Sequence, residues 1–457
     1  MNKENRINKC ACTIIFIVGL ILSILIPTWQ TPDEPAHLEM IGQSIKNDSF
    51  ATELKNDIAI KTGRIEFHPE KKVKESEQKE ALLTPPQYTK REMMPKGITL
   101  GIIKHFPATC GILLGILMGI PTYWALQLGE WTSLLFYTAI CYYTLKKMPI
   151  KKEIMFLIMA SPIALQQAGS LGYDCIVISL SFFFISDILY LKFEKTTIQL
   201  KDIFASIVVL MVITYIKVPY VFFGMLYILI PLEKIQIRVY NKVIDEKWIR
   251  KYGRVFLLIG CICAIGCIYY LKNNRWIQVL YGMVVEWRRA IYLLEQTITT
   301  WHEHIIVSSV GNFGWLDTPM LYGCAIGIYL FIFLFAFVNL DKAENKKFTV
   351  MEAGYIFIVF CVLFLMILLS MVNHTIMVTL FGSEQSKELY NIREALYQIP
   401  YIGGLQGRYF LPFLPLLFLP LPTIKEVKKH VIMIGIIVGE VCIMGYTIFL
   451  LLNRYWI

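Results

Sequence analysis

The sequence predicts an all-α integral membrane protein with about eleven transmembrane helices. Its 457 residues are 56% hydrophobic and only 17% charged, whereas soluble proteins carry about 25% charged residues. Long apolar runs recur along the whole chain, and each is continuous rather than alternating in polarity. A β-barrel would require short alternating segments, so the runs favour helices.

The spans follow from these runs, because a helix needs about 20 mostly apolar residues to cross a bilayer. The first run follows Lys3, Arg6 and Lys9 but lacks a small-residue cleavage site, so an uncleaved first helix is predicted. The runs 200–216 and 218–232 are nearly continuous, and Pro219 predicts a break between them, so they form either two spans or one long broken helix. The predicted spans are 11–28, 122–145, 153–169, 173–192, 200–216, 218–232, 254–272, 321–340, 350–372, 406–422 and 429–452.

Basic residues concentrate in alternate loops, which should therefore lie in the cytoplasm together with the N-terminus. These loops also account for the net charge of +10, so no nucleic-acid partner is expected. Residues 1–457 are predicted to form a single integral membrane domain. The basic loops are the N-terminus, 146–152, 192–201, 233–253, 342–347 and 425–429, and the long loops on the outer side are 29–121, 273–320 and 373–405.

The long first outer loop is polar and carries mixed charge, so amphipathic helices lying on the membrane are predicted within it. Residues 107–120 are too few to span comfortably and are predicted to form an interfacial or re-entrant helix. The loop 273–320, also predicted to be helical at the interface, carries Arg275, Arg288 and Arg289 among aromatic residues.

An acidic hexapeptide, Pro-Asp-Glu-Pro-Ala-His at 32–37, directly follows the first apolar run. It is either a polar helix end in the headgroups or the edge of an active site. A carboxylate near apolar surface has a raised pKa and can take a proton from a sugar hydroxyl. Neighbouring side chains on an extended segment diverge, so Asp33 is the predicted base, and Glu34 would orient the acceptor or bind a metal ion. His37 would be a supporting contact.

Other polar residues lie at helix ends on the same predicted side. Asp174 begins a helix and is either an N-terminal cap or a second functional carboxylate. Lys217 and Arg408 are either snorkelling anchors or the cations that a phosphate leaving group requires. The candidate substrate-binding residues are His37, Asp174, Lys217, Tyr220, Asp317, Arg408 and Tyr409.

A divalent cation, Mg²⁺ or Mn²⁺, is compatible with the carboxylates Asp33 and Glu34 but is not required by the sequence. His302 and His304 are two residues apart, the wrong spacing for two ligands on one helical face. No cofactor is therefore predicted with certainty.

Five segments, in this order, resemble a family of bacterial polytopic membrane proteins of unknown function that is regarded as related to the GT-C glycosyltransferases. The resemblance spans residues from about 12 to 422, and PDEPxH and QGRYFLP are its most specific parts. It implies a GT-C fold, a polyprenyl-phosphate-linked sugar donor, Asp33 as the catalytic carboxylate and Arg408 as a donor-phosphate contact. The segments are Pro32–His37, Gly172–Asp174, Lys217–Tyr220, Gly314–Pro319 and Gln406–Pro412.

The function expected from these observations is transfer of a sugar from a polyprenyl-phosphate donor to a cell-envelope glycan or glycolipid. The reaction would invert the anomeric centre and take place on the outer face of the bacterial cell membrane. A transporter or lipid-linked sugar flippase is one alternative, which predicts charged groups at mid-membrane and internal repeats. A polysaccharide polymerase or ligase is another, and it would differ in using a diphosphate-linked donor.

Overall fold

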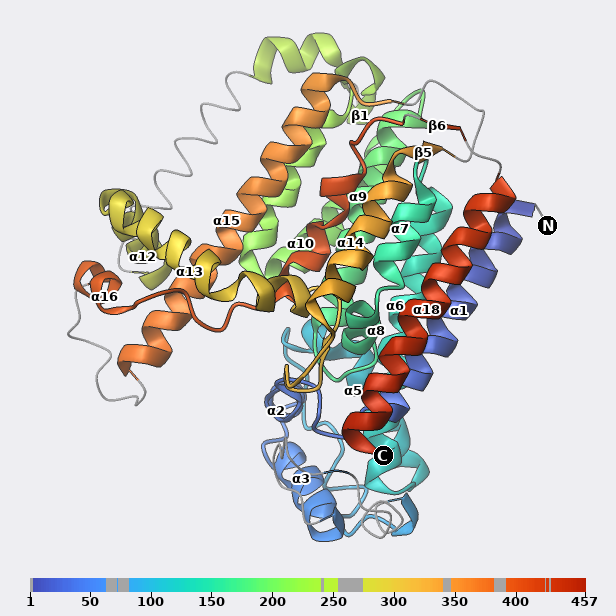
Figure 1. Cartoon of the computed structure of the whole chain (residues 1–457), viewed down its shortest axis with the longest axis vertical. Helices are drawn as coiled ribbons and strands as arrows, with labels where there is room; N and C mark the ends of the chain where they lie inside the picture. The colour runs from blue at the N-terminus through green and yellow to red at the C-terminus, as the bar shows by residue number, and fades with distance from the viewer. Residues whose placement is uncertain are drawn as a thin grey trace.

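The computed structural model describes residues 3–62, 72, 82–239, 242–253, 274–339, 347–381, 392–423, 425–426 and 429–457. Helices dominate this part of the chain and form a bundle with a smaller lobe at one end (Figure 1). The all-α membrane class is thereby supported. Four helices are long and apolar enough to cross a membrane: α1 (Lys3–Leu25), α9 (Asp174–Phe193), α15 (Val350–Phe381) and α18 (Lys429–Tyr455).

Several predicted spans are interrupted, so the count of about eleven stays a prediction. The span 153–169 divides at Pro162, which begins a new helix because proline suits the first helical turn. The predicted break at Lys217 is confirmed, and the segment after it is a 3₁₀-helix. The span 254–272 lies outside the described residues. Besides the four long helices, the bundle contains α6 (Thr122–Lys147), α7 (Lys152–Met159), α8 (Pro162–Ala168), α10 (Leu200–Ile216), η1 (Val218–Leu229), α14 (Tyr322–Ala336), η4 (Gly407–Phe413) and α17 (Pro415–Phe418).

Loops predicted to share the cytoplasmic side meet at one end of the bundle, which we call the basic end. Lys147, at the end of α6, bonds Asp187 of α9, and Lys192 pairs with Glu352 of α15. Lys151 donates to the carbonyl of Ala336, at 2.7 Å. Two short parallel strands, β5 (Val338–Asn339) and β6 (Lys425–Glu426), join two more of these loops. Also near this end are η2 (Leu232–Lys234), β1 (Ile237–Val239) and β2 (Lys242–Ile244).

The first outer loop contains helices, as predicted, and they form a lobe with its own apolar core, whereas their place on the membrane stays a prediction. The lobe contains α2 (Glu34–Ser44), α3 (Ser49–Thr62) and α5 (Ile102–Met118). Apolar side chains of α2 and α3 are buried against α5 and the first turns of α6, since each amphipathic face finds a protein partner there. Most of the segment 107–120, which was predicted to be interfacial, belongs to α5. This helix packs along α6. The core includes Leu38, Ile41, Phe50, Ile112, Ile116 and Leu126.

The second outer loop is helical, as predicted, and projects to one side of the bundle (Figure 1). Arg289 donates to the carbonyls of Leu396 and Ile399 and so fixes the end of a short helix from the third outer loop. The loop continues into a tight hairpin. These elements are α12 (Arg275–Val285), α13 (Trp287–Ser308), β3 (Asn312–Phe313), β4 (Thr318–Pro319) and α16 (Ile392–Gln398).

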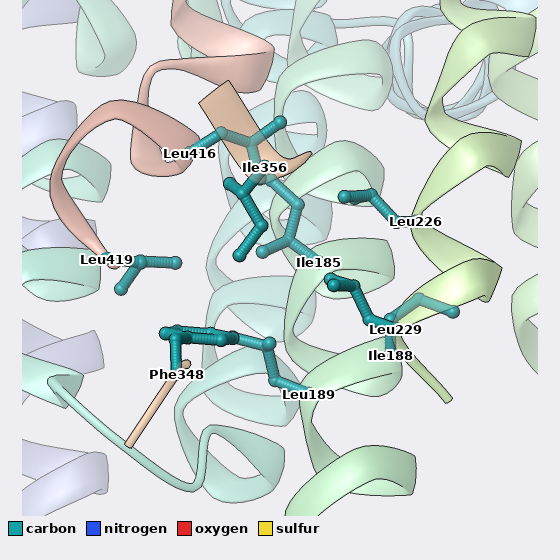
Figure 2. A pocket seen from close by; sticks show the side chains of 9 residues that line it. All are labelled: Ile185, Ile188, Leu189, Leu226, Leu229, Phe348, Ile356, Leu416 and Leu419. Atoms are coloured by element: carbon teal, nitrogen blue, oxygen red, sulfur yellow. The ribbon is translucent and has the colours of Figure 1, made fainter. Parts of the chain in front are cut away.

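A small cavity lies in the bundle core toward the basic end (Figure 2). Its volume is about 10 Å³, which is the space of one water molecule, and apolar side chains alone line it. It offers no polar group to orient a ligand, so it is a feature of core packing. Its lining residues come from α9, η1, α15 and α17, with Phe348 ahead of α15 and Leu419 just after α17: Ile185, Ile188, Leu189, Leu226, Leu229, Phe348, Ile356, Leu416 and Leu419.

Candidate functional site

Four charged side chains from distant segments meet at the end of the bundle away from the basic loops; we call them the charged cluster. Arg408 Nη2 lies 3.3 Å from Asp33 Oδ2, and Arg408 Nε lies 3.8 Å from Asp174 Oδ2. Lys217 Nζ is 2.9 Å from Asp174 Oδ1. The two cations and two carboxylates are therefore linked in one chain of ion pairs.

Helix ends position three of the four groups. Asp174 begins α9, and its carboxylate faces Lys217 and Arg408. No side-chain cap bond is formed at this helix end, so the ion-pair role is the one that the structure shows. Lys217 lies in extended backbone between α10 and η1, with φ −138°, and Arg408 is the second residue of η4. Because the chain leaves regular helix at these points, the side chains are free to converge.

Arg408 is buried, with 5% of its side chain exposed, and is not a snorkelling anchor at the surface. Its Nη1 donates to Gln167 Oε1 at 2.9 Å. A buried guanidinium is costly unless carboxylates and hydrogen-bond acceptors surround it. Asp33, Asp174 and Gln167 supply these partners.

Aromatic rings enclose Lys217. Its Nζ lies 5.1 Å from the ring centroid of Tyr173 and 4.7 Å from that of Tyr409. Such cation–π contacts favour a partly desolvated ammonium group. Tyr220 is fully buried and donates to the backbone carbonyl of Tyr409 at 3.0 Å. Tyr409 therefore borders the site, whereas Tyr220 ties η1 to η4 beneath it.

Asp33 and Glu34 diverge, but not on the extended segment that was predicted: Asp33 has a left-handed backbone just before α2, and Glu34 is the first residue of that helix. Asp33 has a left-handed backbone, with φ 68°, and 55% of its side chain is exposed beside Arg408. Glu34 is 2% exposed and accepts a hydrogen bond from the backbone N–H of Trp29 at 3.1 Å. Burial raises the pKa of Glu34 to about 7, although hydrogen bonds from the neighbouring backbone oppose this.

A shared metal site at Asp33 and Glu34 finds no support in this geometry, because the two carboxylates face different partners. Within the described ranges, no three His, Cys, Asp or Glu side chains are grouped so that they could hold a metal ion.

His37 lies against a second histidine that the sequence did not single out. His37 Nδ1 is 3.0 Å from His105 Nε2, and both rings are buried. The Tyr173 ring meets the His37 ring edge-on, with centroids 4.9 Å apart. Burial lowers the pKa of His37 to about 4 and that of His105 to about 3. One local feature of the sequence could have drawn attention to His105: Phe106-Pro107 follows it, and the proline indicates a disturbed helix. The structure has the kink in α5 at this point.

Asp317 was predicted to bind substrate, but the structure places it in a different contact. Its Oδ2 accepts from Arg454 Nη2 at 2.7 Å and from Arg454 Nε at 3.1 Å. The turn that carries it is tight, since Gly314 and Leu316 both have positive φ. Trp315 Nε1 donates to the carbonyl of Trp29 at 2.6 Å and so anchors this hairpin to the segment before the acidic motif.

Comparison with known proteins gives one match. Residues 16–417 match a family described as "Predicted membrane protein (DUF2142)". No curated protein and no solved structure matches the chain. The matched range contains the whole charged cluster, whereas Arg454 lies beyond it.

Proposed function

The chain belongs to the DUF2142 family of predicted membrane proteins. We propose that it is a membrane glycosyltransferase of the GT-C type. It would transfer a sugar from a polyprenyl-phosphate-linked donor to a cell-envelope glycan or glycolipid. The observation that carries the proposal is the meeting of Asp33, Asp174, Lys217 and Arg408 at one end of an apolar helical bundle.

The two cations suit a phosphate leaving group. Arginine offers two parallel N–H donors to a phosphate, and lysine adds a compact positive charge. Both are poorly hydrated here, because Arg408 is buried and Lys217 is enclosed by rings. The Asp33–Arg408 contact, at 3.3 Å, is longer than the 2.7–2.9 Å typical of charged hydrogen bonds. An arriving phosphate would replace Asp33 on Arg408.

Asp33 would then act as the general base. The acceptor hydroxyl oxygen attacks the anomeric carbon while Asp33 takes its proton. The bond from that carbon to the phosphate oxygen breaks, and polyprenyl phosphate leaves with the bonding electrons. Its negative charge rests against Arg408 and Lys217. Attack from the face opposite the leaving group inverts the anomeric centre.

The charge distribution supports an outward-facing site. Lysines of the basic end would lie in the cytoplasm by the positive-inside rule, so the charged cluster would face the outside of a bacterial cell membrane. Acceptors at that surface are envelope glycans and glycolipids. The donor's polyprenyl chain would remain in the bilayer beside the helices.

Substitution of Asp33 tests the proposal. Membranes that contain Asp33→Asn should accumulate normal protein but lose at least about a hundredfold in sugar transfer, since removing a general base costs 10² to 10⁴ in rate. Transfer is measured from a panel of undecaprenyl-phosphate-linked sugars to envelope acceptors. Asp48→Asn, an exposed aspartate of the same lobe, is the matched control.

The outcomes separate the alternatives. Full transfer by Asp33→Asn would remove Asp33 from the mechanism. Transfer by the unmodified protein from diphosphate-linked glycans alone would identify a polymerase or ligase.

A transporter or flippase is the second candidate, and one observation favours it. Glu440 of α18 and Ser161 line a small cavity where α7 ends and α8 begins. The hydroxyl of Ser161 has no hydrogen-bond partner among the described residues. Ionisable groups within membrane helices often mark transport pathways. Movement of labelled lipid-linked sugar across liposomes that is abolished by Glu440→Gln, with no sugar transfer, would support this function.

A further inference from the structure

The buried histidine pair has a defined place beside the charged cluster. His37 lies in the first turns of α2, and His105 lies at a kink in α5, with non-helical backbone angles of φ −129° and ψ 15°. Pro107 cannot donate a backbone hydrogen bond within α5, and Thr109 Oγ1 donates to the His105 carbonyl at 2.9 Å. The kink therefore presents the His105 ring to His37.

The hydrogen bond between His37 Nδ1 and His105 Nε2 contains one proton. Because each neutral ring carries a single N–H, the ring that donates this proton determines the tautomer of both rings. The other nitrogen of His105, Nδ1, is buried and has no hydrogen-bond partner in the part of the chain that the structure describes. Buried N–H groups without an acceptor are rarer than buried acceptors without a donor. His105 Nδ1 should therefore be unprotonated, so that Nε2–H donates to His37 Nδ1. In a neutral imidazole this leaves the proton of His37 on Nε2.

His37 Nε2 lies against Gly172, directly before Tyr173 and Asp174. A Cβ atom added to Gly172 would lie 3.3 Å from Nε2, which is a tight contact, so glycine leaves more space beside this nitrogen than any other residue would. The charged groups that act on His37 are Asp33, Asp174, Arg408 and Lys217, and His105 also has Lys104 nearby. The two carboxylates offset the two cations, and burial then keeps the imidazoles neutral.

We propose that His105 is a positioning residue, which holds neutral His37 with Nε2–H as a third donor for an oxygen of the substrate phosphate, beside Lys217 and Arg408. This inference rests on the proposed function, because it names the group that the donor phosphate would contact. A neutral donor adds a directed hydrogen bond to the phosphate without a further positive charge.

Binding of undecaprenyl phosphate to the purified full-length protein in detergent tests the proposal. His105→Phe removes the donor to His37 and should weaken binding about tenfold, which is the effect of one hydrogen bond. His105→Gln retains an N–H donor at a similar position and should restore most of the affinity. His302→Phe, on the exposed face of α13, is the control.

A spectroscopic measurement separates positioning from a general structural effect. Two-bond ¹H–¹⁵N spectra of protein labelled at histidine should show His37 protonated at Nε2, and a mixture of tautomers in His105→Phe. A proton at His37 Nδ1 in the unmodified protein would overturn the inference. Unchanged affinity in His105→Phe, or failure of His105→Gln to restore it, would also overturn it. No binding by the unmodified protein would instead count against the proposed function.

Discussion

Asp33 and Glu34 show how two adjacent carboxylates acquire different environments. The left-handed backbone at Asp33 turns the chain into α2, so that its side chain stays exposed next to Arg408. Glu34 is in the first turn of the helix and faces the interior, where the Trp29 N–H meets it. The exposed carboxylate of Asp33 is accessible to solvent, and the buried carboxylate of Glu34 holds the segment that precedes it.

The raised pKa of Glu34 predicts a pH-dependent stability. Its pKa is about 7 in the folded protein, against 4.5 for a glutamate side chain exposed to water. The unfolded chain therefore loses the proton first as pH rises, and stability should decline between about pH 4.5 and 7. Glu34→Gln keeps an acceptor for Trp29 and removes the titration. The variant should be more stable than the unmodified protein at pH 8, by up to a few kcal/mol, with little difference at pH 4.5.

Chemical unfolding in detergent at the two pH values measures this difference. Glu39→Gln, an exposed carboxylate on the same helix, provides the control. An equal stability difference at both pH values would contradict the prediction.

At the scale of elements, breaks in apolar helices place the charges. Pro219 follows Lys217 closely and lies in the first turn of η1, a 3₁₀-helix of 12 residues. Such helices seldom exceed three or four residues, and long examples often mark functional segments. The proline predicted the break near Lys217, and the structure places Pro219 in the first turn of η1, where a missing backbone N–H costs least. The 3₁₀ geometry of the following segment was not predictable, since it depends on packing against α10 and α15.

Close contact between α5 and α6 gives a second prediction. A Cβ atom on Gly111 would lie 2.3 Å from the carbonyl oxygen of Leu128 and 2.2 Å from Thr132 Oγ1. Gly111→Ala should therefore destabilise the lobe by about 1–3 kcal/mol, although alanine favours helix by about 1 kcal/mol. An added Cβ atom on Gly327 in α14 would meet no described atom within 4 Å apart from its own helix backbone, so Gly327→Ala should leave stability unchanged or slightly raised.

Thermal melting of both purified variants provides the measurement. The prediction fails when Gly111→Ala melts at or above the temperature of Gly327→Ala.

At the scale of the whole molecule, the two ends of the bundle differ in charge arrangement. One end carries the lysine-rich loops, and the other carries the charged cluster and the first-loop lobe. The sequence predicted which loops share an end, because their basic residues alternate with the apolar runs. The contacts of Lys147, Lys151 and Lys192 with residues of other loops agree with that grouping.

Accessibility of engineered cysteines tests which end faces outward. In a background with the native cysteines replaced by serine, Lys96→Cys of the lobe should react with a membrane-impermeant maleimide in intact cells. Lys146→Cys at the basic end should react only after permeabilisation. Both lysines are exposed, so access to the reagent depends on the side of the membrane. The reverse labelling pattern would place the charged cluster in the cytoplasm.

The sequence by itself determined the membrane class, the break at Lys217 and the grouping of loops. Each of these follows from local composition: apolar run length, a proline, and the positions of lysines. It also identified Asp33, Asp174, Lys217 and Arg408 as candidates. Their proximity was expected only because all four were predicted to lie at helix ends on the same side of the membrane.

Tertiary structure alone decided which side chains meet. The pairing of His37 with His105, the inward position of Glu34 and the partnership of Asp317 with Arg454 join residues whose local sequence does not specify a partner. The reason is physical: such contacts depend on how helices from distant parts of the chain pack, and on which buried polar groups must then find partners. The sequence therefore indicated which charged residues lie at one end of the bundle, and packing determined which of them pair.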